Sequence, residues 1–267
     1  EGVNTLASYL KSDVDLNIPV SKVKQEKTFA VIIANENYQE EVNVEFALND
    51  GMAFREYCVK LLGIPKSNLH IRKDATLNNM LAEINWMQNI AKAYGAEARF
   101  IFYYAGHGMP DESNGTSYLL PVDGKSNILA TGYSMSRLYA ELNGLNAACV
   151  TVLMDACFSG SKRGEGMLAS ARGVALKAKA EAPKGNMLVM TAAQGSETAY
   201  PYKEKKHGLF TYFLLKKLQE SKGKVTYGDL FDYVKTNVAQ KSVVVNEKSQ
   251  TPTIAVSGDL VSTWQGI

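Results

Sequence analysis

Two apolar segments of this 267-residue chain each end in a residue that can do chemistry. The first, ARFIFYYAGHG, places His107 between two glycines, and the second, CVTVLMDACFSG, places Cys157 before a Ser-Gly turn. A histidine can act as a general base or acid and a cysteine as a nucleophile, so this pair is suited to acyl transfer. The thiolate would attack a carbonyl carbon, and the imidazole would supply the proton to the leaving group.

Both segments are expected to form buried strands of a parallel sheet. Each is rich in β-branched and aromatic residues and stops abruptly at small residues, as buried parallel strands do. Ligands bind outside the carboxyl ends of such strands, so we expect His107 and Cys157 to lie at that edge of the sheet. The glycines beside His107 would let the backbone approach a substrate closely.

The rest of the chain alternates predicted strands and helices, which indicates an α/β fold with a mostly parallel sheet covered on both faces. The first 27 residues are polar, have no clear period and are interpreted as an arm that packs on the domain surface. A final strand after Pro252 is expected at an edge of the sheet. Strands are also predicted at 28–34, 68–73, 116–121 and 186–192, and helices at 44–62, 77–94, 134–142, 208–219 and 227–239.

Composition and charge are those of an ordinary globular protein. Hydrophobic residues make up 46% of the chain, and the net charge is +2. So small a charge gives no reason to expect nucleic acid or an anionic membrane as partner. No apolar run approaches the roughly 18 residues that a bilayer span requires. No signal-peptide pattern is visible, but the chain begins at Glu1, so the compartment is left open, as is the oligomeric state.

The three cysteines have different settings. An odd number at wide spacing argues against a disulfide framework and against a zinc knuckle. Cys58 falls in a helical pattern and Cys149 in a strand pattern, so both are expected to be core thiols, whereas Cys157 ends its strand. The other two histidines, His70 and His207, are expected to be structural, with His207 as a candidate for a helix start.

The motifs YYAGHG and DACFSG resemble the histidine and cysteine motifs of the caspase, metacaspase and paracaspase superfamily in residues, order and 50-residue separation. The similarity is closest to bacterial caspase-like proteins and extends from about Thr28 to about Pro252. It implies an α/β, caspase-like three-layer sandwich, with a mostly parallel six-stranded sheet and helices on both faces. The implied organisation is an arm at 1–27 and one peptidase domain at 28–267, made of a large part at 28–160, a linker at 161–185 and a small part at 186–267.

The resemblance also implies a cysteine endopeptidase with His107 and Cys157 as its catalytic dyad. The backbone N–H groups of Gly108 and Cys157 would hold the oxyanion. Ser159 is a weaker candidate nucleophile, because no G-x-S-x-G elbow surrounds it. A substrate would lie extended and pair with a backbone edge, which the resemblance assigns to Ala193, Gln194, Gly195 and Ser196.

Specificity is expected to differ from that of animal caspases, which carry Gln two residues before the cysteine. This chain carries Asp155 there, and residues two apart on a strand point to the same side, so Asp155 should face the same cleft as the thiol. Asp50 in ALND matches an acidic position of metacaspases and paracaspases, and Glu197 in QGSE resembles the acid after a Gln-Gly pair in the small part of paracaspases. Clustered carboxylates bind guanidinium and ammonium groups, which predicts protein or peptide substrates cleaved after Arg or Lys. Taken singly, Asp50 could instead be a solvated helix residue and Glu197 a loop charge.

No metal or other cofactor is expected. Many metacaspases bind calcium through an aspartate cluster that includes an Asp-Asp pair, but the corresponding region here carries Met135 and Ser136, and Asp123 alone offers too few oxygens. The basic residues of the 161–185 linker fit a solvated, partly helical loop. A protease specific for basic residues could also cut itself there, with Arg163 and Arg172 as the preferred sites.

Two other functions fit the sequence less well than peptidase activity. A scaffold or regulatory module with the same fold would usually have lost its cysteine or histidine, and both are present here. A nucleotide-binding α/β domain would need a glycine-rich loop after the first strand, but that strand is followed by Asn35, Glu36, Asn37 and Tyr38.

Overall fold

Six strands form the central sheet of the computed structural model, which describes residues 11–111, 116–156, 158, 183–195, 197–263 and 265. Their order is β11-β8-β7-β3-β1-β2, and all run parallel except the edge strand β11. The expected edge position of the final strand is therefore confirmed. The strands are β1 (Thr28–Ala34), β2 (Leu69–Lys73), β3 (Arg99–Ala105), β7 (Cys149–Asp155), β8 (Met187–Thr191) and β11 (Thr253–Val256).

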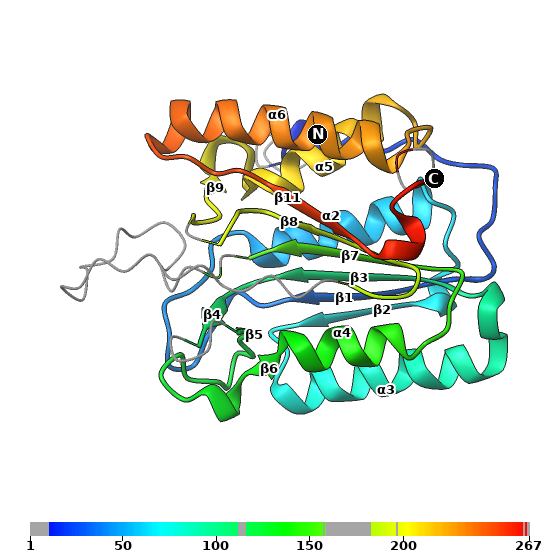
Figure 1. Ribbon diagram of the computed structural model, residues 1–267. Coiled ribbons are helices and arrows are strands. Elements are labelled where there is room, and N and C mark those ends of the chain that lie inside the picture. Colours follow the sequence, from blue (N-terminus) through cyan, green and yellow to red (C-terminus); the bar gives the residue numbers. More distant parts are fainter. Residues whose placement is uncertain are drawn as a thin grey trace, which may run out of the picture.

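Helices cover both faces of the sheet and complete three layers (Figure 1). One face packs against α2 (Ala47–Lys60), α5 (Leu209–Glu220) and α6 (Tyr227–Asn246). The other packs against α3 (Leu77–Tyr94) and α4 (Met135–Asn143). Strands β1 and β7 are buried at every position, because their apolar side chains enter a core on each side of the sheet.

Local sequence signals account for most helix boundaries. Thr76 caps α3, where its Oγ1 accepts a hydrogen bond from Asn79 N, and Ser134 caps α4, as the sequence predicts. Helix α2 begins three residues later than expected, because Phe46 at its N-cap has left-handed backbone (φ 69°). Helix α6 continues past its predicted end at residue 239 through a partly exposed valine run, which gave no amphipathic signal.

Strands β4 (Gly108–Pro110), β5 (Ser117–Leu119) and β6 (Tyr133–Ser134) form a small antiparallel sheet after the His107 segment. A hairpin of β9 (Pro201–Tyr202) and β10 (His207–Gly208) leads directly into α5. The predicted strand at 116–121 is present as the shorter strand β5, whereas β4, β6, β9 and β10 were not predicted because they are too brief to show a period.

The N-terminal segment contributes to the core. A short 3-10 helix, η1 (Asp13–Asp15), packs against α2 and α5, and Val14 is fully buried there. Tyr57 of α2 donates a hydrogen bond from its hydroxyl to the Val14 carbonyl at 2.7 Å. The sequence predicted surface packing for this arm but gave no sign of an ordered turn within it.

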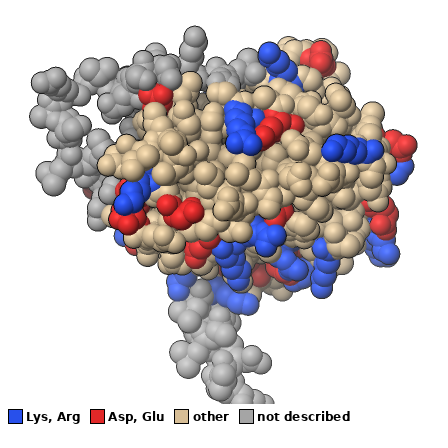
Figure 2. All heavy atoms as spheres, turned by 90° about the horizontal axis from the view of Figure 1, so that it is seen from below, with Lys and Arg blue, Asp and Glu red and all other residues tan. Residues whose placement is uncertain are grey.

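Acidic and basic side chains are interspersed on the face that carries α3 and α4, as Figure 2 shows. Among the helices of the described residues, none has the length and apolar character needed to cross a membrane.

Candidate active site

His107 lies just beyond the end of β3, at the edge of the sheet where β7 also ends. In the register of these two parallel strands, Ala105 lies opposite Asp155. In the sequence, His107 comes two residues after Ala105, and Cys157 comes two residues after Asp155. The Gly106 N–H donates a hydrogen bond to the Asp155 carbonyl at 3.3 Å, which ties the two segments together at this point. Cys157 itself lies outside the described residues.

The imidazole of His107 is held in one orientation by backbone and aromatic contacts. The residue is 5% exposed, and its Nε2 lies 2.8 Å from the carbonyl oxygen of Val42. A carbonyl oxygen only accepts hydrogen bonds, so Nε2 carries a hydrogen and Nδ1 is the basic nitrogen of the neutral ring. The ring also packs against Tyr38, with 4.7 Å between ring centroids.

Two tyrosines hold the backbone of His107. The His107 N–H donates to the Tyr38 hydroxyl at 2.7 Å, and the Tyr104 hydroxyl donates to the His107 carbonyl at 2.7 Å. Sequence reasoning missed Tyr38 and Val42 as parts of the site. Val42 acts through its carbonyl, for which no residue type is diagnostic, and both residues lie more than 60 positions from His107.

The backbone N–H of Gly108 points away from strand β5. Hydrogen bonds from Leu120 N to the His107 carbonyl (2.9 Å) and from Asp111 N to the Thr116 carbonyl (2.7 Å) mark two hydrogen-bonded positions of the β4–β5 ladder. Because such positions alternate along antiparallel strands, the pair of Gly108 and Leu119 between them is not hydrogen-bonded. The Gly108 N–H is thus directed out of the ladder, as an oxyanion donor requires.

Asp50 and Asp155, which are 105 positions apart in the sequence, both bind the N-terminal end of helix α5. Both residues are fully buried. One carboxylate oxygen of Asp155 accepts hydrogen bonds from the backbone N (3.1 Å) and hydroxyl (2.8 Å) of Thr211. The Asp50 carboxylate accepts from Gly208 N at 3.0 and 3.1 Å, and its Oδ1 lies 2.8 Å from His207 Nδ1. The interpretation of Asp50 as a solvated helix residue is therefore wrong.

Glu197 binds at a different place from Asp50 and Asp155, next to the start of strand β11. Its carboxylate accepts hydrogen bonds from Thr251 N at 2.5 Å, from Thr251 Oγ1 at 3.1 Å and from Gln194 Nε2 at 2.8 Å. The expected substrate-pairing residues Ala193, Gln194 and Gly195 form a turn after β8, closed by a hydrogen bond from Glu197 N to the Gln194 carbonyl. Ser196 lies outside the described residues, as do Ser159, Arg163 and Arg172.

The other thiols and His70 are integrated in the framework of the fold. Cys58 and Cys149 are buried, and burial raises the pKa of each thiol, which is the opposite of activation. His70 lies 2.6 Å from Glu83 through Nδ1 and stacks on Trp86. Asp123 accepts a hydrogen bond from Leu77 N at the start of α3. The described residues contain no group of three or more His, Cys, Asp or Glu side chains arranged to hold a metal ion.

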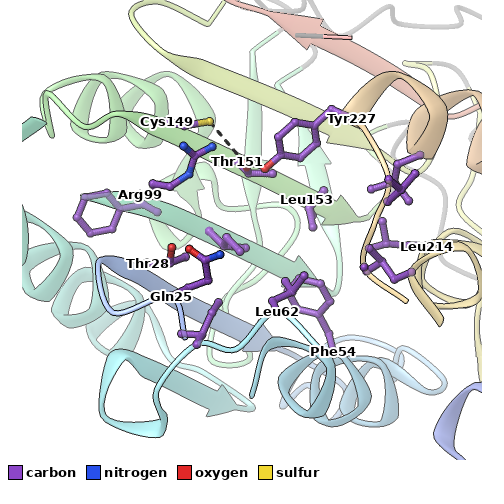
Figure 3. Close-up of a pocket in the computed structure, with 17 residues that line it drawn as sticks. Gln25, Thr28, Phe54, Leu62, Arg99, Cys149, Thr151, Leu153, Leu214 and Tyr227 are labelled. Carbon is purple, nitrogen blue, oxygen red and sulfur yellow. Dashed lines mark hydrogen bonds between the residues drawn. The ribbon is translucent and has the colours of Figure 1, made fainter. Parts of the chain in front are cut away.

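A cavity of about 430 Å³ opens at the opposite end of the sheet (Figure 3). It lies between the sheet and helices α2, α5 and α6, and its wall includes Phe54, Leu153 and Leu214. Arg99 and Cys149, which begin β3 and β7, also line it. Since a strand rises about 3.3 Å per residue, Arg99 at the outer end of the cavity lies roughly 20 Å along β3 from the strand end that precedes His107. The cavity is therefore not part of the candidate active site.

Comparisons with known proteins identify the family and the fold of the chain. The caspase domain family model (Peptidase_C14) matches residues 27–259. Among solved structures, the crystal structure of protein GSU0716 from Geobacter sulfurreducens is 19% identical, with a TM-score of 0.61 over 86% of this chain and 93% of that one. Caspase-1 from Spodoptera frugiperda is 14% identical, with a TM-score of 0.61 over 91% and 92%. No curated protein matches this chain. The predicted caspase-like fold is confirmed.

Proposed function

Because the chain belongs to the caspase domain family, we propose that it is a cysteine endopeptidase that cleaves protein substrates after Arg or Lys. The observation that carries the proposal is the register of β3 and β7. Ala105 and Asp155 are paired at the ends of these neighbouring strands, and His107 and Cys157 each follow their strand end by two residues in the sequence. A nucleophile and a base at one edge of a parallel sheet are the parts that acyl transfer needs.

In the proposed mechanism His107 transfers the proton and Cys157 forms the covalent bond. Nδ1 of His107 accepts the thiol proton, and the sulfur attacks the peptide carbonyl. The N–H groups of Gly108 and Cys157 would stabilise the oxyanion. The proton then passes to the leaving amine, and water hydrolyses the acyl-enzyme to restore the thiol. The Val42 carbonyl holds Nε2–H throughout, so Nδ1 is the nitrogen that carries out these transfers.

The preference for basic residues rests on Asp50 and Asp155. Two carboxylates beside the strand end that precedes Cys157 favour a guanidinium or ammonium group nearby. Glu197 and the backbone at Ala193–Ser196 are proposed to contribute from the end of β8. A peptide laid along that segment would add backbone hydrogen bonds that do not depend on its sequence.

Hydrolysis of fluorogenic peptides ending in Arg, Lys, Asp or Leu tests the proposal, with calcium chelated and Cys157→Ala as the control. We expect turnover of the Arg and Lys peptides that disappears in the variant. Turnover of the Asp peptide alone would contradict the acidic pocket, and no turnover would favour a scaffold. Intact mass of both proteins after incubation tests the proposed self-cleavage at Arg163 or Arg172, which identical single chains would rule out.

Gly106→Ala is expected to lower kcat/KM of the Arg peptide by about 10²-fold, the effect of misplacing a catalytic group by about 1 Å. A Cβ at Gly106 would lie 2.7 Å from the hydroxyls of both Tyr38 and Tyr104, which hold the His107 backbone. Gly144→Ala is a matched control, since a Cβ there meets its nearest neighbour at 3.4 Å. Steady-state kinetics of both variants would contradict the expectation if Gly106→Ala retained full activity.

A further inference from the structure

The cavity at the far end of the sheet has one charged end and one apolar end (Figure 3). Alternate residues of β3 and β7 form its floor, because side chains two positions apart on a strand point to the same side. Arg99 lies opposite Cys149 in the register of these strands. Two positions further along, Ile101 lies opposite Thr151, and Leu153 of β7 follows. The lining therefore changes from a guanidinium group to hydrocarbon along the direction of the strands.

The inner part of the cavity is an apolar space that the side chains around it leave unfilled. Helices α2, α5 and α6 contribute Phe54, Leu214 and Leu230 to its wall. Ile101 is only half-buried although β3 lies in the middle of the sheet, because its side chain faces this space. A volume of about 430 Å³ is in the range of small-molecule pockets, and unfilled apolar spaces bind apolar molecules.

The hydroxyl groups in the wall bind each other. Thr151 Oγ1 lies 2.5 Å from the hydroxyl of Tyr227, the first residue of α6. Because this pair needs no further hydrogen-bond partner, a hydrocarbon chain can lie against it without leaving either hydroxyl unsatisfied. The interior of the cavity therefore suits an alkyl chain better than a polar ligand.

Arg99 places a positive charge at the outer end of the cavity. Its side chain is exposed, and no carboxylate of the described residues forms an ion pair with it. The three other arginines in the described part of the chain each bind a glutamate. Glu97, two positions before Arg99, is bound to Lys27. A guanidinium group binds a carboxylate through two parallel hydrogen bonds, so Arg99 is suited to an anionic headgroup.

We propose that this cavity binds a fatty acid of medium chain length, whose carboxylate contacts Arg99 and whose alkyl chain lies between the sheet and helices α2, α5 and α6. From Cys149 to Leu153 the strand rises about 13 Å, a length that suits the chain of decanoate. This inference does not depend on the proposed peptidase activity, because the cavity lies at the other end of the sheet from His107.

Isothermal titration calorimetry of the complete chain with decanoate, at neutral pH and below its micellar concentration, tests the proposal. We expect one decanoate bound per chain. Arg99→Gln should weaken binding about 10- to 100-fold, the loss expected when hydrogen bonds to a charged group become bonds to a neutral one. The neutral alcohol 1-decanol should bind wild type and Arg99→Gln alike. Arg137→Gln is the matched control, since it removes an exposed arginine from α4 on the other face of the sheet.

Methyl NMR of the wild-type chain locates the bound molecule without any substitution. Resonances of Ile101 and Leu214, which line the cavity, should shift on addition of decanoate. The resonance of Ile84 should not, because this residue packs against the opposite face of the sheet. Ile101→Trp, which fills the cavity from its floor, should abolish binding.

Three results would overturn the inference. Decanoate affinity that Arg99→Gln leaves unchanged would remove the headgroup contact. Shifts confined to methyl groups outside the cavity would show binding elsewhere on the surface. Absence of decanoate binding by the wild-type chain, as expected if a second copy or another segment covers the cavity, would remove the site altogether.

Discussion

His107→Ala is expected to lower kcat/KM for an Arg peptide by about 10³-fold, within the range that a general acid–base group contributes. Val42 holds Nε2–H, so Nδ1 is the nitrogen of His107 that can exchange a proton. Removal of the ring therefore leaves no group to take the proton from the thiol and pass it to the leaving amine. The measurement is steady-state kinetics, together with the alkylation rate of Cys157 read by mass spectrometry. Both kcat/KM and the alkylation rate should fall.

Other histidine and cysteine residues of the chain provide two controls for this experiment. His70→Ala removes a histidine that stacks on Trp86 and contacts Glu83, so it should leave kcat/KM unchanged. Cys58 and Cys149 are buried with raised thiol pKa values, so alkylation at neutral pH should report Cys157 alone. A His107→Ala protein that keeps activity within tenfold of wild type would remove His107 from the proposed mechanism.

The sequence carried enough information for the sheet and for the location of the site. Strands such as β3 and β7 are continuous apolar runs that end at small residues, and this pattern places His107 at a strand end without knowledge of any partner. The same pattern cannot reveal contacts made through backbone atoms. The Val42 carbonyl is the clearest case, because any residue type could present the same oxygen to His107.

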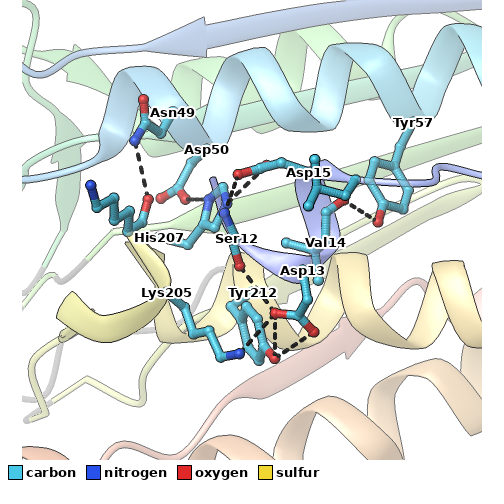
Figure 4. A network of polar contacts seen from close by, with 12 residues as sticks. Ser12, Asp13, Val14, Asp15, Asn49, Asp50, Tyr57, Lys205, His207 and Tyr212 are labelled. Atoms are coloured by element: carbon cyan, nitrogen blue, oxygen red, sulfur yellow. Dashed lines mark hydrogen bonds and ion pairs between the residues drawn. The ribbon is translucent and has the colours of Figure 1, made fainter. Parts of the chain in front are cut away.

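His207 shows a second limit of sequence-based reasoning. The sequence offered it as a candidate for a helix start, and it lies in β10, two residues before α5 begins. The sequence gave no sign that Asp50, 157 positions away, would be its partner (Figure 4). The contact forms because β10 leads the chain into α5 directly beside the first turns of α2. Long-range pairing of charges depends on how elements pack, and neither hydrophobic period nor turn residues encode it.

Asp155→Asn is expected to raise KM for Arg and Lys peptides roughly 10- to 100-fold, the loss expected when a hydrogen bond to a charged group becomes one to a neutral group. The substitution changes the charge with little change of shape. The Asn carbonyl oxygen can still accept both hydrogen bonds from Thr211, so α5 keeps its cap. Kinetics with Arg, Lys and uncharged peptides would measure the change, and selectivity for the basic peptides should fall.

Thr211→Val is the matched control, because it separates the two roles that Asp155 can have. It removes the hydroxyl that donates to Asp155 and leaves the carboxylate charge in place. We expect a loss of about 1 to 2 kcal/mol in the free energy of unfolding, since the Tyr103 hydroxyl also loses its contact with Thr211. Preference for basic residues should persist. If Asp155→Asn kept that preference while Thr211→Val lost it, Asp155 would be a cap of helix α5 and the basic pocket would have to lie elsewhere.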